Sequence, residues 1–190
     1  MAVLSDDQLK TIFHDVTVEI TGLDTNSGVR NTYPREGQPA WKIDDNIVFV
    51  TIQPIVNQYG LLRDKVYIPN SPVSGETLTS RESVQYTLVI AADWVFYGPD
   101  AFTLANKTRF EILQPDALSA LSTYEIAPIT DIDPPRLASE LLAGQWWKRY
   151  DLRVLFNVLV TEAKTIPYLE GSTILLYTEK GLHETIDIEE

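Results

Sequence analysis

The stretch VQYTLVIAADWVFYGPDAFTLANKT, residues 84–108, predicts a long strand that leads directly into a helix. Every second residue from 84 to 96 is apolar, an alternation that is typical of a strand with one buried face. The residues of that face are Val84, Tyr86, Leu88, Ile90, Ala92, Trp94 and Phe96. The opposite face includes Asp93 and Tyr97, and we expect it to be partly exposed or covered by a neighbour.

The spacing of apolar residues becomes helical after Gly98-Pro99-Asp100. Because proline suits the first turn of a helix, we expect Pro99 to occupy the first helical position, with Gly98 or Asp100 near the cap. The residues at helical spacing are Ala101, Leu104, Ala105, Thr108 and Ile112. A strand followed at once by an amphipathic helix allows the helix to fold back across the sheet.

Other elements are expected on both sides of this stretch. Ser5 and Gln8 have the spacing of a capping box, which predicts a helix over residues 5–20 that ends at Gly22. Strands are predicted at residues 29–33, 46–53, 125–129, 146–162 and 173–178, and short helices at 115–124, with Leu118 and Leu121 inward, and at 137–142.

These elements predict an α+β fold with a mostly antiparallel sheet of long strands, flanked on one side by an N-terminal helix and a central helix. The length favours a single domain over residues 1–190. Residues 54–81 contain many prolines, glycines and serines, so we expect a long loop or a protruding hairpin there. Residues 183–190 are expected to form an acidic, frayed tail.

The formal net charge of −12 argues against a protein that grips the phosphate backbone of nucleic acid. Ordinary solubility explains this charge, but an acidic wall also suits a channel through which DNA passes without sticking. Since the chain has no cysteine, disulfides and cysteine metal sites are excluded, which fits a cytosolic origin. With no long apolar run and no signal-peptide pattern, we expect a soluble protein without a membrane partner.

Residues with catalytic potential are few. His14 and His183 are the only histidines, and each is expected to be a polar structural residue. Asp131 and Asp133 form a carboxylate pair, but the two prolines that follow favour a solvated turn. Because the nucleotide-binding and hydrolase motifs are also absent, we expect no catalytic residue, no metal and no cofactor.

Aromatic and charged side chains supply candidates for a subunit interface instead, because aromatic residues and arginine are enriched at protein interfaces. Adjacent Trp146 and Trp147 point to opposite faces of a strand, so one of them is expected to leave the core. Either both cover the rim of the sheet or one contacts a partner. The interface candidates are Trp94, Tyr97, Trp146, Trp147, Arg149, Asp151, Arg153, Tyr59, Leu61 and Leu62.

The three charged candidates share one strand face, which is by default a solvated surface. In a ring they would pair with acidic groups of the adjacent subunit. The apolar residues at 59, 61 and 62 lie in the segment 54–81, and we expect that segment to reach a neighbouring subunit or an adjoining ring.

The order of these features resembles the bacteriophage tail terminator and neck terminator proteins. Four segments carry the resemblance, and it leaves out residues 54–81 and the acidic end. They are the helix ending in TGLD at 21–24 with the strand after it, the strand closing as DWVFYGPDA at 93–101, the helix that follows, and GQWWKRYDLRVLF at 144–156.

The resemblance implies a non-enzymatic structural protein of the virion, at the head-to-tail joint. It implies a homo-oligomeric ring of six subunits around an axial DNA channel, with DNA only as passing cargo. The implied partners are a connector or portal-side neck protein and a tail tube or sheath protein. Assembly is expected in the host cytoplasm.

Two other functions stay open at the level of sequence. One is a different structural component of the virion, such as a connector, tube or baseplate subunit, since these also use small α+β subunits. The other is a metal-dependent hydrolase that uses Asp131 and Asp133.

Overall fold

The computed structural model describes residues 4–33, 37, 40–58, 62–69, 79–142, 144–167, 171–178 and 181–189. The chain divides into two compact units. The first unit comprises Met1–Leu62 and Tyr86–Val160, and the second comprises Arg63–Gln85 and Thr161–Glu190. Two long strands, β4 (Thr79–Tyr97) and β9 (Arg149–Pro167), contribute residues to both units.

A mostly antiparallel sheet forms the first unit, in the order β1-β2-β4-β9-β5, which confirms the predicted α+β class. The remaining strands of this order are β1 (Val29–Asn31), β2 (Ile47–Pro54) and β5 (Ile126–Pro128). β2 pairs antiparallel with β4, and β5 pairs antiparallel with β9, whereas β1 and β2 run parallel. A two-residue strand, β6 (Arg136–Leu137), also pairs with β9.

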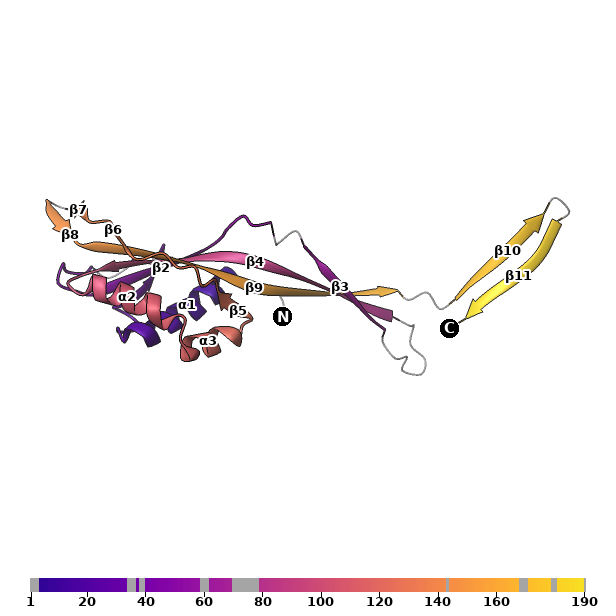
Figure 1. Cartoon of the computed structure of the whole chain (residues 1–190), viewed down its shortest axis with the longest axis horizontal. Helices are drawn as coiled ribbons and strands as arrows, with labels where there is room; N and C mark the ends of the chain where they lie inside the picture. The colour runs from indigo at the N-terminus through magenta and orange to yellow at the C-terminus, as the bar shows by residue number, and fades with distance from the viewer. Residues whose placement is uncertain are drawn as a thin grey trace. The chain divides into compact units, whose positions relative to one another are not determined.

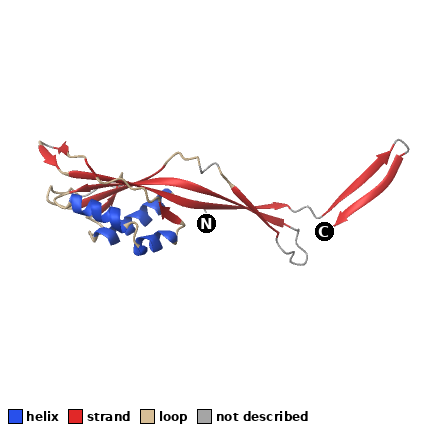
Figure 2. Ribbon diagram, viewed as in Figure 1, coloured by secondary structure: helices blue, strands red, loops and turns tan. Residues whose placement is uncertain are grey.

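Three helices cover one face of this sheet (Figures 1 and 2). They are α1 (Asp6–Thr21), α2 (Ala101–Glu111) and α3 (Pro115–Ser122). Even-numbered residues of β2, β4 and β9 supply the sheet side of the core, as the alternation in the sequence predicts. The large, fully buried residues among them are Val48, Ile90, Trp94, Phe96, Leu152 and Phe156.

The helix boundaries follow local sequence signals closely. Ser5 and Gln8 form the predicted capping box, and Gly22 ends α1 in a left-handed conformation. Asp100 is the N-cap of α2, one of the two residues expected near the cap, but Pro99 lies before the cap instead of at the first helical position. In α3, Leu121 is buried as expected, but Leu118 is 37% exposed, which corrects its predicted inward position.

Trp94 is the largest fully buried side chain and lies at the centre of the first unit. Its ring meets Phe13 of α1 edge-on, with centroids 6.2 Å apart, and it lies 6.3 Å from the ring of Phe156. The indole Nε1–H donates to the hydroxyl of Thr17 over 2.8 Å, and that hydroxyl donates to the carbonyl of Phe13 over 2.6 Å. Helix α1 is thereby joined to the sheet by packing and by a buried hydrogen bond.

Replacing Thr17 by valine is expected to lower the free energy of unfolding by about 1–3 kcal/mol, because the indole N–H of Trp94 then stays buried without an acceptor. Thr108→Val is the matched control. Thr108 is also fully buried, but its hydroxyl only donates to the carbonyl one helical turn back, so a loss below about 1 kcal/mol is expected. Urea denaturation of both variants measures the difference, and equal losses would contradict the assigned hydrogen bond.

The turn between β4 and α2 is closed by contacts from the start of β2. Gly98 has φ of +106°, and a Cβ there would lie 2.5 Å from the carbonyl oxygen of Asp45. The side chain of Asn46 accepts from the backbone N–H of Asp100 over 3.0 Å and donates to its carboxylate over 2.8 Å. The strand and the helix therefore meet at a turn that is bonded to a neighbouring strand.

The secondary structure of residues 137–162 differs from the prediction. Residues predicted as a helix at 137–142 form the end of β6 and the strand β7 (Glu140–Leu142), which pairs with β8 (Gln145–Trp147). The long strand predicted at 146–162 is interrupted at Lys148, so that β8 belongs to a separate two-stranded sheet and β9 begins at Arg149. These residues form strands because pairing with a partner strand outweighs their local helical spacing.

The second unit consists of paired strands. β3 (Asp64–Pro69) pairs antiparallel with the first part of β4, so this part of the segment 54–81 is a hairpin strand rather than a loop. β10 (Gly171–Thr178) pairs with β11 (Gly181–Glu189), which corrects the frayed tail predicted from residue 183 as far as residue 189. The missed signal is the alternation of Ile186 and Ile188 with acidic residues. Of the helices in the described ranges, none is long and apolar enough to cross a membrane.

Candidate subunit interface

The β7–β8 hairpin has two faces that differ in their contacts. Its register pairs Glu140 with Trp147 and Leu141 with Trp146. Residues that are directly opposite in an antiparallel pair point to the same side, and the next pair along points to the other side. Glu140 and Trp147 therefore share one face, which we call the inner face, and Leu141 and Trp146 share the outer face.

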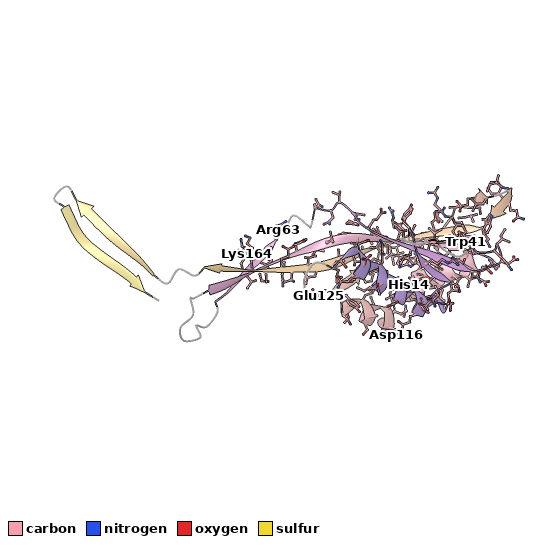
Figure 3. All side chains as sticks on the ribbon, turned by 180° about the vertical axis from the view of Figure 1, so that it is seen from behind. His14, Trp41, Arg63, Asp116, Glu125 and Lys164 are labelled. Atoms are coloured by element: carbon pink, nitrogen blue, oxygen red, sulfur yellow. The ribbon has the colours of Figure 1, made fainter. Side chains whose placement is uncertain are left out.

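The inner face is attached to the first unit by aromatic and polar contacts. Trp147 meets Trp41 edge-on, with ring centroids 6.1 Å apart, and Trp41 in turn contacts Phe49 and Tyr97. Figure 3 places Trp41 at the end of the sheet where the hairpin lies. The hydroxyl of Tyr97 donates to the carboxylate of Glu140. These contacts hold the hairpin against the sheet.

Charged groups complete the attachment. The guanidinium of Arg149 donates to the carboxylate of Asp151 over 2.7 Å and to that of Glu140 over 3.4 Å. The hydrogen bond to Asp151 raises the pKa of Arg149, which stays charged. Burial, followed by the hydrogen bond to Glu140, raises the pKa of Tyr97 to about 12, so its phenol remains a donor at neutral pH.

The outer face has large apolar side chains in solvent. Trp146 is 70% exposed and Leu141 is 56% exposed. The prediction that one of the two adjacent tryptophans leaves the core is therefore correct, and that residue is Trp146. A tryptophan that is exposed on a structured hairpin is typical of an interface, because burying it in a partner removes 150–250 Å² of surface from water, as an order of magnitude.

Other interface candidates from the sequence are placed differently. Trp94 is 1% exposed, so it is a core residue and cannot contact a partner, which corrects that prediction. Tyr97 is buried beneath the hairpin. Tyr59 and Leu61 lie outside the described residues, whereas Leu62 is described and exposed.

The charged side chains of Arg149, Asp151 and Arg153 have ion-pair partners within the subunit. Arg153 donates to both carboxylate oxygens of Asp93, at 2.6 and 3.0 Å, and Gln53 donates to the same carboxylate. Arg149 and Asp151 bind each other. Within the subunit these three charged candidates therefore already have partners, and their pairing with a neighbouring subunit stays a prediction.

The sheet face away from the helices has a shallow groove that the sequence does not predict. Its volume is about 560 Å³, and its walls come from β4, β9 and the residues after β2 and β5. The lining residues are Ile55, Asn57, Thr87, Val89, Ile129, Leu155 and Asn157. They come from four separate segments of the chain, and no motif in any one of them indicates a groove.

Residues with catalytic potential do not converge. A ring nitrogen of His14 lies 3.0 Å from the carbonyl oxygen of Thr25, in a contact between α1 and the turn after it. Asp131 and Asp133 are exposed, and His183 lies in β11. In the described ranges, no group of three or more histidine, aspartate or glutamate residues is arranged to hold a metal ion.

The chain matches the family model described as "Phage neck terminator protein" over residues 7–179. The chain belongs to the phage neck terminator family. The match confirms the resemblance to tail and neck terminators, and it includes both the sheet with its helices and the β7–β8 hairpin. None of the curated proteins matches the chain.

Membership of the neck terminator family makes the chain a structural protein of a bacteriophage neck. A neck protein acts through contacts with other virion proteins, so its exposed apolar surfaces are the features to explain. In this neck terminator the outer face of the β7–β8 hairpin is such a surface, and it is held in place by contacts of the inner face.

Proposed function

We propose that the chain is a non-enzymatic subunit of a ring at the head-to-tail joint of a tailed phage. The observation that carries this proposal is the outer face of the β7–β8 hairpin, where Leu141 and Trp146 are exposed on a structure that is anchored from its other side. Exposed apolar residues of this kind are suited to permanent contacts in an assembly. Family membership supports the location in the neck.

The ring has six subunits and surrounds the channel through which DNA passes. Its charge supports this arrangement, because a net charge of −12 on each subunit repels the duplex and keeps it from adhering to the wall. The partners are a connector or portal-side neck protein on one side and a tail tube or sheath protein on the other. Assembly takes place in the host cytoplasm.

Other structural roles in the virion and a hydrolase role are weaker alternatives. A connector, tube or baseplate subunit would share the fold class, but the family match favours the neck. The hydrolase would rely on Asp131 and Asp133, which are exposed and belong to no metal-binding group in the described ranges. The double variant Asp131→Asn, Asp133→Asn is expected to bind phage heads and tails as the parent does.

The ring is tested by mass and by images of the purified protein, alone and with tail tubes. We expect about 129 kDa for six copies of the 21.5 kDa chain, and ring-shaped particles at the end of the tubes. Heads and tails from a phage that lacks the protein should join when it is added. A protein that stays monomeric under all these conditions and joins no heads to tails would contradict the proposal.

A further inference from the structure

The outer face of the β7–β8 hairpin needs a partner to be buried. An isolated two-stranded hairpin is marginally stable in water, and among the described residues its contacts with the rest of the subunit come from the inner face. The cross-strand pair of Leu141 and Trp146 remains in solvent. A partner that covers this pair would gain a large apolar contact without reordering the hairpin.

The groove on the sheet is lined by side chains that suit contact with Leu141 and Trp146. Val89, Leu155 and Ile55 give it apolar walls, and Asn57 and Asn157 place amide groups among them. An apolar cavity of about 150 Å³ holds a benzene ring, so a groove of about 560 Å³ has room for an indole and a leucine side chain together. The exposed amide of Asn157 can accept a hydrogen bond from an indole N–H.

The hairpin cannot occupy the groove of its own subunit. β9 begins at Arg149 beside the hairpin and reaches the groove at Leu155, six residues further along the same strand. At about 3.3 Å per residue this is a separation of about 20 Å. The hairpin and the groove are thus two distinct surfaces of one chain, which is the requirement for a head-to-tail contact between copies.

Charge limits which surfaces of two copies can meet. Two copies of a chain with net charge −12 repel each other, so a contact between them is best made through uncharged surfaces. The outer face of the hairpin has Leu141 and Trp146, and the residues of the groove are all apolar or neutral. These two uncharged surfaces can meet without bringing acidic groups together.

We propose that Trp146 and Leu141 of one copy dock in the Ile55, Val89 and Leu155 groove of the next copy around the ring. This inference rests on the proposed ring function, for which it names the contacting surfaces. Each subunit then uses its hairpin toward one neighbour and its groove toward the other. Repetition of such a contact closes a ring when the rotation between subunits is a simple fraction of a full turn.

Cross-linking tests the contact directly, because the chain has no natural cysteine. Leu141 lies beside Trp146 on the outer face of the hairpin, Asn157 lies in the groove, and both are exposed. The double variant Leu141→Cys, Asn157→Cys is treated with a short bismaleimide, both as purified protein and bound to tails. We expect a ladder of covalent oligomers up to the size of the ring, whereas each single variant should give nothing larger than a dimer.

A second variant tests the energy of the contact. Trp146→Ala should weaken subunit association about 30-fold or more, as is usual for a central tryptophan of an interface. Phe110→Ala is the control, because Phe110 is also an exposed aromatic residue but lies on α2, away from both surfaces. Its association should equal that of the parent chain. Circular dichroism confirms that both variants keep the fold.

The outcomes separate this inference from the proposed function. If the parent chain forms rings but the double variant gives no ladder and Trp146→Ala rings persist, the docking of hairpin into groove is wrong while the ring function stands. If Trp146→Ala keeps the ring but no longer joins heads to tails, the hairpin binds another virion protein, and the inference is again overturned. A parent chain that forms no ring on its own or on tails contradicts both.

Discussion

Trp94→Ala is expected to lower the free energy of unfolding by about 3–5 kcal/mol, the usual range for removing a large aromatic side chain from a core. The side chain is 1% exposed and packs between α1 and β9, where it contacts Phe13 and Phe156. Removing it leaves a cavity at the junction of helix and sheet. It also removes the indole donor that binds Thr17.

Guanidinium chloride denaturation followed by circular dichroism measures this loss. Phe110→Ala is the control, because it removes an aromatic ring at a position that is 64% exposed and outside the proposed interface, and a change within about 0.5 kcal/mol is expected there. Trp94→Phe retains a ring in the core and should lose less than Trp94→Ala. Similar losses for Trp94→Ala and Phe110→Ala would show that the assigned core is wrong.

Gly98→Ala is expected to destabilise the protein by about 2–5 kcal/mol, through two separate effects. A side chain at positive φ costs about 1–2 kcal/mol, and the φ here is +106°. The added Cβ would also lie 2.5 Å from the carbonyl oxygen of Asp45 and 2.6 Å from the side-chain oxygen of Asn46, so the turn must shift at a further cost of about 1–3 kcal/mol.

Gly22→Ala separates these two effects. Gly22 has φ of +71°, but a Cβ there meets no atom within 4 Å, so only the cost of the backbone conformation applies. Thermal unfolding of the two variants should show the larger fall in melting temperature for Gly98→Ala. An equal fall would mean that the close approach of β2 to the turn does not constrain this position.

The helices and the central strands were predictable because their signals are local. The capping box at Ser5, the left-handed end at Gly22 and the alternation through Trp94 each depend on residues only a few positions apart. The fold class and the family resemblance follow from the order of these elements. At residues 137–142 pairing overrode local helical spacing, and at 183–189 the prediction missed the alternation of Ile186 and Ile188 with acidic residues.

The candidate interface was predictable only in part. Two adjacent tryptophans on a strand must face opposite ways, so the exposure of one of them follows from the sequence. Alternation along one unbroken strand would have placed Trp146 with the core residues and Trp147 with the charged ones. The interruption at Lys148 reverses this assignment, because β8 pairs with β7 and its inner face packs on Trp41.

The sequence by itself therefore determined the α+β class, the strand and helix of residues 84–108, the acidic charge and the likeness to neck terminators. Only the tertiary structure decided which tryptophan is exposed, that Arg149 and Arg153 find their partners within the subunit, and that a groove exists. The physical reason is distance along the chain. Helix caps and strand alternation depend on near neighbours, whereas these contacts depend on the register between segments that are far apart in sequence.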